Sequence, residues 1–437
     1  MEFIRKKNIK SWAKEFNGEY FIYEPKTTQD VKEILSNKRN IIPSGGFRSY
    51  GDSALNVNMI NSKNFDKIIS FDDRIGVLKA QSGVTIETLL NFLIPKGWFL
   101  KVTPGTKYAT LGGCIASDVH GKEHHKEGCF SESVKSIKII TNKKETIILT
   151  KKNFPELFKA TCGGMGLTGF ISEATIQCKQ IKSSKIKFKK ILNKSLNEVF
   201  LCFENFKEFT YSVAWIDTIE KKKEFKSIFI IGEFSEDLKF SIKKKPKFSI
   251  FLNLKIINNL TIILFNKLYF FWNYFNKKSG VIDYDSFFYP LDKINNWHKL
   301  YGNNGFVQYQ FIVPKILSKK AILEVLNYMN DKKFYSSLAV LKLHGAQNQN
   351  YLSFPMSGYS LALDFPANKK TFNHLKELDK IILKYQGKIY LTKDSRMDSN
   401  LFNKIYPQYK EILKIKKEHN IFNFSSKQSE RLGINEN

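Results

Sequence analysis

Two glycine-bearing loops, at residues 43–53 and 104–113, constrain this chain more than any other feature. The first lies in the run IIPSGGFRSYGD (residues 41–52), and the second reads PGTKYATLGG. Each loop follows an apolar run, and small residues allow backbone N–H groups to approach a diphosphate closely. Tyr50 lies in the first loop and His120 shortly after the second. The pattern therefore predicts a bound dinucleotide whose reactive ring lies near ionisable groups.

The length of 437 residues and a hydrophobic content of 42% allow two or three domains with a sizeable core. The formal net charge of +29 indicates an anionic partner such as nucleic acid, phospholipid or a phosphorylated substrate. Almost all the positive residues are lysines, however, and arginine occurs at only six positions. Because nucleic-acid readers favour arginine for bidentate contacts, a basic nucleic-acid-binding protein is kept only as a second alternative.

Cysteine usage and hydropathy indicate the cellular compartment in which the protein is expected to work. Five cysteines without a CxxC pair predict a reducing environment rather than a disulfide framework. The N-terminal run MEFIRKKNIKSWAKEF has no apolar core of signal-peptide length. No window offers the roughly 18 uncharged apolar residues that a spanning helix requires. We therefore expect a cytoplasmic protein.

Strands and helices alternate over the first 180 residues, which predicts an α+β or α/β fold. Thr27 to Asp30 is typical of a capping box, and an apolar helix face follows. A second helix is expected over 86–94, with Gly97 as its stop. Further expected strands are 41–42, 75–80, 136–141, 145–150, 170–178, 227–231, 305–312, 338–343, 359–363 and 389–391; further expected helices are 318–331, 369–385 and a polar tail at 398–420.

Residues 248–275 are strongly apolar and carry only two charges, Lys255 and Lys267. One interpretation is a core or capping segment of a second domain. The other is a membrane-docking surface flanked by lysines, which would place the protein on the inner face of the membrane. The sequence leaves both interpretations open.

Two motifs invite interpretations that the sequence does not support. The run Gly164 to Gly169 matches GxGxxG, but it precedes an expected strand, and no acidic residue follows where a nicotinamide-binding loop would need one. His120, Glu123, His124 and His125 lie close together, but a metal site needs a fixed geometry and usually a distant ligand. We expect no metal, a solvated loop for His124 and His125, and a place beside the cofactor ring for His120.

Two further groups of residues allow either a structural or a functional interpretation. Arg48 to Asp52 is either an ordinary turn or, with the second loop, a place where Ser49 and loop amides hold phosphate while Tyr50 faces substrate. Lys393 follows the expected strand 389–391 and is either a surface lysine or a buried group that holds an anion or has a lowered pKa.

Six motifs share their order and spacing with a known family, over about residues 40 to 430. They are PGTKYATLGGCIASDVHGKEHH, GGMGLTGF, GFVQYQF, VLKLHG, SFPMSGYSLALDFP and YLTKDSR. Together they resemble the FAD-linked oxidases of the vanillyl-alcohol-oxidase superfamily, and within it the decaprenylphosphoryl-β-D-ribose oxidase family, the flavin half of an epimerase pair. The resemblance implies an α+β fold with a two-subdomain FAD-binding domain of the PCMH type. Residues 1–183 and 388–437 would form that domain, and residues 184–387 would form an inserted antiparallel-sheet substrate domain.

The resemblance also implies roles for individual residues. Lys393, Tyr50 and His120 would be catalytic, and Gln308, Gln310, Lys342 and Ser360 would bind substrate. The FAD contacts would be Pro43, Ser44, Gly45, Gly46, Phe47, Arg48, Ser49, Tyr50, Gly51, Asp52, Ser53, Gly105, Thr110, Leu111, Gly112, Gly113, Ser117, Asp118, Val119, His120, Ile171 and Tyr390.

Three positions depart from the family's pattern. Phe47 stands where a glycine is usual in the first loop, so the backbone there is expected to differ. Ala362 stands where the family has an inhibitor-reactive cysteine, which should remove covalent capture without removing catalysis. Asp52 stands where covalent members of the superfamily attach the flavin to a histidine, so we expect dissociable FAD.

The activity that the resemblance implies is oxidation of the ribose C2 hydroxyl of a polyprenyl-phosphate pentose to the keto sugar. This would be the first half of a 2-epimerisation towards a polyprenyl-phosphate arabinose, with a separate NAD(P)H-dependent reductase as partner. Lys393 is the first candidate for orienting or deprotonating the hydroxyl, with Tyr50 and His120 as alternatives. The main rival is a soluble FAD-dependent aldose or hydroxy-acid oxidase.

Overall fold

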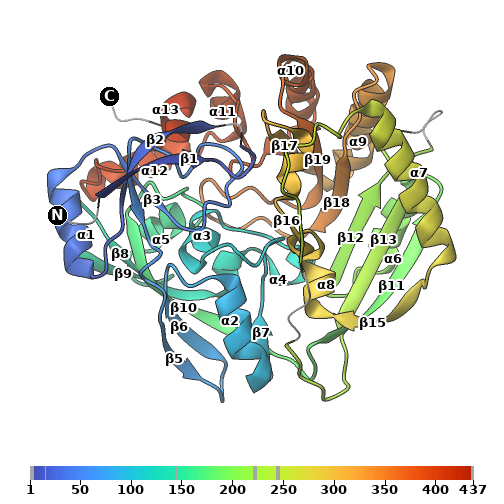
Figure 1. Cartoon of the computed structure of the whole chain (residues 1–437). Helices are drawn as coiled ribbons and strands as arrows, with labels where there is room; N and C mark the ends of the chain where they lie inside the picture. The colour runs from blue at the N-terminus through green and yellow to red at the C-terminus, as the bar shows by residue number, and fades with distance from the viewer. Residues whose placement is uncertain (1–3, 15, 143–144, 220–223, 243–246, 435–437) are drawn as a thin grey trace.

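The fold is described from a computed structural model, which describes residues 4–14, 16–142, 145–219, 224–242 and 247–434. Strands and helices are mixed throughout, so the prediction of an α+β protein is confirmed. Figure 1 shows two halves side by side: one holds the blue and cyan N-terminal elements and the red C-terminal helices, and the other holds the green to orange elements.

Two sheets lie in the first half. The smaller has the order β1-β2-β4-β3 and is parallel between β2 and β4 and between β4 and β3. The larger has the order β5-β6-β10-β8-β9, with β7 also paired to β10, and its pairings are antiparallel. Their strands are β1 (Ile4–Lys10), β2 (Asn17–Tyr23), β3 (Ile41–Ser44), β4 (Asn58–Asn61), β5 (Ile68–Asp72), β6 (Val77–Gln81), β7 (Trp98–Leu100), β8 (Val134–Ile140), β9 (Thr146–Leu149) and β10 (Phe170–Gln180).

The helices of this half are short. Thr27 caps the first of them with the expected capping box, in which its side chain accepts from the Asp30 amide and the Asp30 carboxylate accepts from the Thr27 amide. They are α1 (Thr28–Asn37), α2 (Ile86–Leu93), α3 (Leu111–Ala116), α4 (His124–Glu127) and α5 (Pro155–Thr161), with 3-10 turns η1 (Ile94–Lys96) and η2 (Phe130–Ser133).

An eight-stranded antiparallel sheet organises the second half, in the order β15-β11-β13-β12-β18-β19-β17-β20. Its strands are β11 (Lys185–Asn193), β12 (Tyr211–Ile216), β13 (Ser227–Phe234), β15 (Ser279–Asp283), β17 (Phe306–Pro314), β18 (Leu338–His344), β19 (Gly358–Pro366) and β20 (Lys388–Ile389). The remaining elements are α6 (Leu196–Asn205), β14 (Phe248–Ser249), α7 (Asn259–Phe275), α8 (Tyr284–Phe288), η3 (Pro290–Lys293), β16 (Ile294–Asn295), η4 (Trp297–Tyr301), α9 (Lys315–Asp331) and α10 (Lys369–Lys384).

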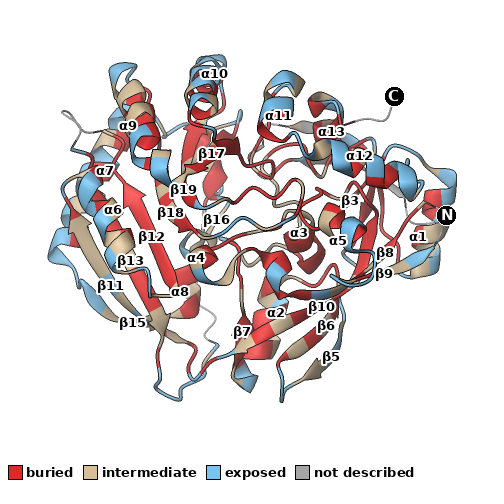
Figure 2. Ribbon diagram, turned by 180° about the vertical axis from the view of Figure 1, so that it is seen from behind, coloured by how far each residue is buried: buried red, intermediate tan, exposed pale blue. Residues whose placement is uncertain are grey.

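The two ends of the chain pack against each other. After β20 the chain returns to the first half through α11 (Ser399–Ile405), α12 (Tyr409–Glu418) and α13 (Lys427–Leu432), which Figure 1 shows in red beside the blue strands. Ile41 bridges Phe424 in parallel, and the Lys427 amide donates to the Leu55 carbonyl. One buried core runs through both halves, as the red interior of Figure 2 shows.

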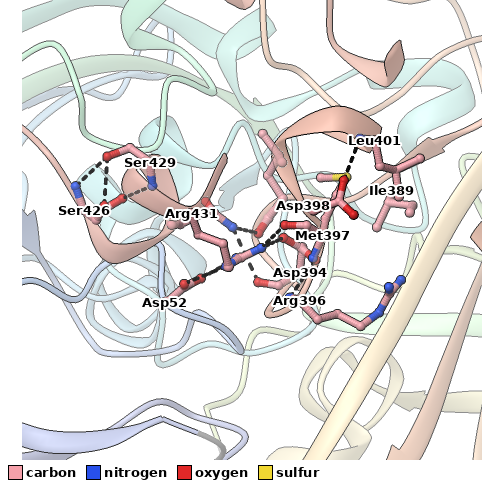
Figure 3. A network of polar contacts seen from close by, with 12 residues as sticks. Asp52, Ile389, Asp394, Arg396, Met397, Asp398, Leu401, Ser426, Ser429 and Arg431 are labelled. Atoms are coloured by element: carbon pink, nitrogen blue, oxygen red, sulfur yellow. Dashed lines mark hydrogen bonds and ion pairs between the residues drawn. The ribbon is translucent and has the colours of Figure 1, made fainter. Parts of the chain in front are cut away.

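A partly buried arginine, Arg431, fastens the first glycine loop to the C-terminal segment (Figure 3). Arg431 binds both carboxylate oxygens of Asp52, at 2.7 and 3.0 Å, and also Asp394 at 3.0 Å. The same guanidinium donates to the Met397 carbonyl at 2.6 Å. Both carboxylates are almost fully buried, so they depend on Arg431 for their charge partner.

The apolar stretch 248–275 is not buried in a core, so that form of the first interpretation was wrong, but α7 does lie over the large sheet as a capping segment would. α7 leaves most of its hydrophobic side chains in solvent, and the preceding residues 251–256 are exposed as well. Within the described part of the chain, no helix combines the length and the hydropathy needed to cross a bilayer.

We predict that Arg431→Met destabilises the protein strongly, because it leaves the buried Asp52 and Asp394 carboxylates without a cation. Breaking a buried ion pair from one side costs about 3–5 kcal/mol, and chemical denaturation should show a loss of that size. The matched control is Arg74→Met, since Arg74 pairs with Asp72 at the surface and is 86% exposed. That change should alter the free energy of unfolding by less than about 1 kcal/mol. Equal effects of both substitutions would contradict the assigned role.

Candidate active site

The first glycine loop packs directly on the second. A Cβ on Gly45 would lie 2.2 Å from the Thr110 hydroxyl, and one on Gly46 would lie 2.5 Å from the Tyr108 carbonyl. Any side chain at these two positions would therefore push the loops apart. Phe47 adopts a left-handed backbone with φ of 51°, a conformation that is easy for glycine but strained for phenylalanine.

This loop presents donors without internal partners. The amides of residues 46–49 donate to no acceptor in the described part of the chain. The guanidinium of Arg48 lies over the rings of Trp12 and Tyr108, at 4.3 and 5.0 Å, and its buried Nε has no partner there either. Successive free amides beside an arginine form a concave anion-binding site. The donor set fits the diphosphate of a dinucleotide.

The second loop does not offer free amides to a phosphate, as the sequence interpretation expected. Its amides donate hydrogen bonds within the protein. Leu111 donates to the Val84 carbonyl, Gly112 to the Ser82 carbonyl, and Gly113 to the Thr110 hydroxyl that caps α3. A Cβ on Gly112 would lie 2.8 Å from that of Ser82. The glycines here allow α3 to pack closely on the chain around Ser82.

A third loop, residues 163–166, joins the first two. Its Met165 amide donates to the Ala116 carbonyl, and a Cβ on Gly166 would lie 3.6 Å from Pro43 Cδ. The GxGxxG run, Gly164 to Gly169, begins in this loop and is followed directly by β10, so the expectation of a following strand is confirmed. A helix N-terminus, which the nicotinamide-binding form of the motif requires, does not follow it.

Lys393 lies beside the first loop rather than on the open surface. Its Nζ is 3.4 Å from the centroid of the Tyr50 ring, and the Tyr50 amide donates to the neighbouring Thr392 carbonyl. Burial lowers the pKa of Lys393 to about 7, and nearby Lys342 acts in the same direction while Asp364 opposes both. Burial raises the pKa of Tyr50, so the phenol stays protonated.

Asp364 is the carboxylate that faces this lysine. Its Oδ1 accepts from Gln308 Nε2 at 2.6 Å, and its Oδ2 has no partner among the described residues. Burial raises the pKa of Asp364 to about 7, against the opposing effects of the Gln308 hydrogen bond and of Lys393. Lys393 and Asp364 therefore both titrate near neutral pH.

His120 belongs to a group of buried histidines. Gln310 Nε2 donates to His120 Nε2 at 2.9 Å, which leaves the proton of the neutral ring on Nδ1. The His344 ring is 4.9 Å away and is held by Ser360 through a 2.8 Å contact. Burial, reinforced by Lys342, lowers the pKa of both histidines well below the usual value.

The solvated loop expected for His124 and His125 was wrong. His124 is buried in α4, where its Nδ1 accepts from the Gly345 amide and its Nε2 contacts Cys129 Sγ. His125 is half-buried against the Phe209 carbonyl at 2.8 Å. The short helix turns His124 towards His344, which the sequence spacing did not indicate.

Lys342 and Lys122 place further positive charge beside the histidines. Burial lowers the pKa of Lys342, and it lowers that of Lys122 to about 7, each opposed by Glu123. Lys122 Nζ is 3.1 Å from the Phe288 carbonyl, and Glu123 accepts from the Thr103 amide. Two lysines facing one buried carboxylate leave a local excess of positive charge that suits an anion.

Some expected cofactor residues have structural partners instead. The Asp118 carboxylate accepts from Ser131, Asn348, Asn350 and Ser353, so its side chain is fully engaged. The remaining expected residues lie around the same loops. Tyr390 donates to the Ser117 carbonyl at 3.2 Å, its ring lies 5.0 Å from His120, Ile171 is buried on β10, Val119 follows α3, and Gly105, in the second loop, is exposed.

Four residues of the site were missed from the sequence: Trp12, Lys122, His344 and Asp364. His344 and Asp364 lie within the motifs VLKLHG and SFPMSGYSLALDFP, and strand alternation places them on the same face as Lys342 and Ser360. Trp12 had no local signal. Among the described residues, no group of three or more His, Cys, Asp or Glu side chains is arranged to hold a metal ion.

Comparison with known proteins agrees with this geometry. A protein-family model described as an FAD binding domain matches residues 21–150. The chain is 33% identical over 405 residues to decaprenylphosphoryl-β-D-ribose oxidase of Mycolicibacterium smegmatis, covering 87% of this chain and 86% of that protein. It is 30% identical to a mitochondrial L-galactono-1,4-lactone dehydrogenase of Brassica oleracea over 36% of this chain and 26% of that protein. It is 27% identical to a D-lactate dehydrogenase of Anaerostipes hadrus over 36% of this chain and 35% of that protein.

The family match and the donor set of the first loop agree on FAD as the cofactor, and the relatives are oxidases and dehydrogenases of alcohol-type donors. The chain is therefore a member of the FAD-dependent oxidases of the vanillyl-alcohol-oxidase superfamily, within the decaprenylphosphoryl-β-D-ribose oxidase family.

Proposed function

We propose that this enzyme oxidises the ribose C2 hydroxyl of a polyprenyl-phosphate pentose to the keto sugar, as the first half of a 2-epimerisation towards a polyprenyl-phosphate arabinose. The observation that carries the proposal is Lys393, a lysine with a pKa of about 7 beside the first glycine loop. The similarity to decaprenylphosphoryl-β-D-ribose oxidase over most of both chains supports the substrate class.

Residues of both chain ends would hold FAD non-covalently in this proposal, and the bound cofactor would supply the acceptor for the hydride that leaves C2. The amides of residues 46–49 and the Arg48 side chain would bind the diphosphate, and α3 and residues 163–166 would line the cofactor site. Asp52 is bound to Arg431 and offers no nucleophile for a covalent link. Residues 184–387 form the substrate domain, although β20 extends its sheet to Ile389.

Lys393 takes the hydroxyl proton in this mechanism. A general base works best when its pKa lies near the working pH, which burial provides here. Tyr50 stays protonated and therefore cannot take the proton, and His120 is too weak a base because its pKa lies well below the usual value. Loss of the hydride and the proton removes two electrons from the secondary alcohol and converts it to the ketone.

The substrate is recognised by side chains from neighbouring strands of the large sheet. Gln308 lies opposite Asp364 and Gln310 opposite Ala362. In this proposal both side-chain amides bind sugar hydroxyls. Ser360 lies opposite Lys342, which offsets the phosphate charge together with Lys122. A sugar that leaves these polar groups unpaired would be rejected. Ala362 offers no thiol at this face.

The product is a ketone, so a separate NAD(P)H-dependent reductase would complete the epimerisation in the cytoplasm. A free hydroxy-acid or aldose substrate has weaker support, since the lactate and lactone dehydrogenases match only about a third of this chain. Nucleic acid has no support beyond the net charge.

The direct test is anaerobic mixing of the yellow holoenzyme with a panel of polyprenyl-phosphate pentoses. Loss of flavin absorbance with the ribose form, and its absence with free ribose or 2-hydroxy acids, is the expected result. Bleaching by free sugars or hydroxy acids alone would overturn the substrate assignment.

Lys393→Arg separates a proton acceptor from a plain positive charge. Arginine keeps the charge but does not lose its proton, so we expect flavin reduction to slow about 10²–10⁴-fold. The flavin spectrum should be unchanged, and Lys384→Arg, at an exposed position, is the control. Retention of full turnover by Lys393→Arg would remove Lys393 as the base.

The rate of flavin reduction should rise with pH through an apparent pKa of about 7, because only neutral Lys393 accepts a proton. Asp364 holds the lysine pKa up, so Asp364→Asn should move the rise to lower pH. Stopped-flow reduction between pH 5.5 and 9 measures both curves. A shift to higher pH would contradict the assigned pairing.

Lys342→Met should raise the KM of the phosphate-bearing substrate about 10–100-fold while leaving kcat within a few-fold, since a charge-assisted contact contributes about 1.5–3 kcal/mol. For a matched substrate with a neutral group in place of the phosphate, Lys342→Met should leave the KM unchanged. An equal loss with both substrates would argue against phosphate binding by Lys342.

A further inference from the structure

The helix α7 turns a largely polar side to the protein and its apolar side to solvent, which is the reverse of an ordinary surface helix. Its buried residues are Ile262, Asn266 and Asn273, whereas most of its hydrophobic side chains are exposed to solvent. We call this exposed stripe the α7 apolar face. It consists of Leu260, Leu264, Phe265, Leu268, Phe271, Trp272 and Phe275, each more than half exposed.

Polar contacts fix the helix in this orientation. Asn266 donates to Asp217 Oδ1 at 2.7 Å, and Lys190 Nζ donates to Asn273 Oδ1 at 2.8 Å. The Tyr269 ring packs edge-on against Trp215 of β12 at 5.1 Å. Rotating the helix to bury its apolar face would break these contacts, so the exposure is built into the packing.

The chain before α7 also exposes large apolar side chains. Phe248, Phe251 and Leu252 are each more than two-thirds exposed, although β14 pairs with β16 and anchors the segment. Monomeric soluble proteins seldom present so many large apolar side chains together. A surface of this composition requires a covering medium or partner.

The sequence of this segment carries charge of one sign. Residues 238–282 contain no acidic residue and nine lysines, which are Lys239, Lys243, Lys244, Lys245, Lys247, Lys255, Lys267, Lys277 and Lys278. A second copy of the chain would bring the same lysines against these and be repelled. Anionic headgroups over a hydrocarbon interior match both the charge and the apolar stripe.

The helix also lies on the face of the large sheet that carries the substrate residues. Residues directly opposite in an antiparallel sheet share a face, and Trp215, which contacts α7, lies opposite Val340. Val340 lies opposite Ala362, and Ala362 opposite Gln310. The α7 contacts and the candidate substrate residues therefore occupy neighbouring strips of one sheet face.

We propose that the α7 apolar face, with the exposed residues 248–252, docks the enzyme on an anionic lipid bilayer. The aromatic and leucine side chains enter the headgroup boundary while the lysines pair with lipid phosphates. Docking itself does not rest on the proposed reaction. If that reaction holds, docking brings a lipid-linked sugar to the sheet face that oxidises it.

Vesicle flotation of the holoenzyme tests this directly. Wild-type protein should float with vesicles of equal parts phosphatidylglycerol and phosphatidylcholine at low salt, and at least tenfold less with pure phosphatidylcholine or in 1 M salt. The variant Phe265→Ser/Phe271→Ser/Phe275→Ser should lose at least tenfold of the binding. The matched control is Ile75→Ser/Ile148→Ser/Leu201→Ser, which removes three exposed apolar side chains elsewhere and should bind as wild type.

Flavin content and turnover on a short-chain, water-soluble substrate should be unchanged in both variants, because none of the six positions belongs to the site. Failure of wild type to bind anionic vesicles, or equal binding by the two variants, would overturn the proposal. A concentration-dependent dimer that only the α7 variant abolishes would also overturn it, by assigning the face to a second copy. None of these outcomes depends on whether the pentose is the substrate.

Discussion

The buried ion pairs of Arg431 are the constraint on which the rest of the site depends. This guanidinium binds Asp52, at the end of the first glycine loop, and Asp394, next to Lys393. Gly51 lies so close to the Asp394 carbonyl that a Cβ there would be 1.9 Å away. The loop that presents free amides and the lysine that titrates near neutrality are thus held in register by one residue, thirty-seven positions beyond Asp394.

Desolvation then determines the pKa values of the side chains that this packing brings together. Lys393, Lys342 and Lys122 have lowered pKa values because burial penalises their charged forms, and the histidines respond in the same direction. Only one carboxylate, Asp364, opposes this effect at Lys393. A site with excess buried positive charge favours an anionic ligand and keeps a neutral amine available as a base.

The sequence predicted the loops and most strands because these depend on local signals, whereas the return of the C-terminal segment was implied only by the family resemblance. The Thr27 capping box, the helix stop at Gly97 and the glycines that face Thr110 and Tyr108 act within a few residues or through steric need. It did not predict that the amides of Leu111 and Gly112 are already used, or that Asp364 opposes Lys393. Those facts arise from pairings across the fold that no short window contains.

The apolar stretch 248–275 shows why composition alone left two interpretations open. Hydrophobicity predicts burial only when a helix turns its apolar side to the protein, and here Asn266 and Asn273 occupy the buried stripe. The two asparagines satisfy Asp217 and Lys190 on the sheet, so the polar side of the helix is the one that the protein needs. The apolar side is left for something outside the chain, and the absence of acidic residues from 238 to 282 restricts what that can be.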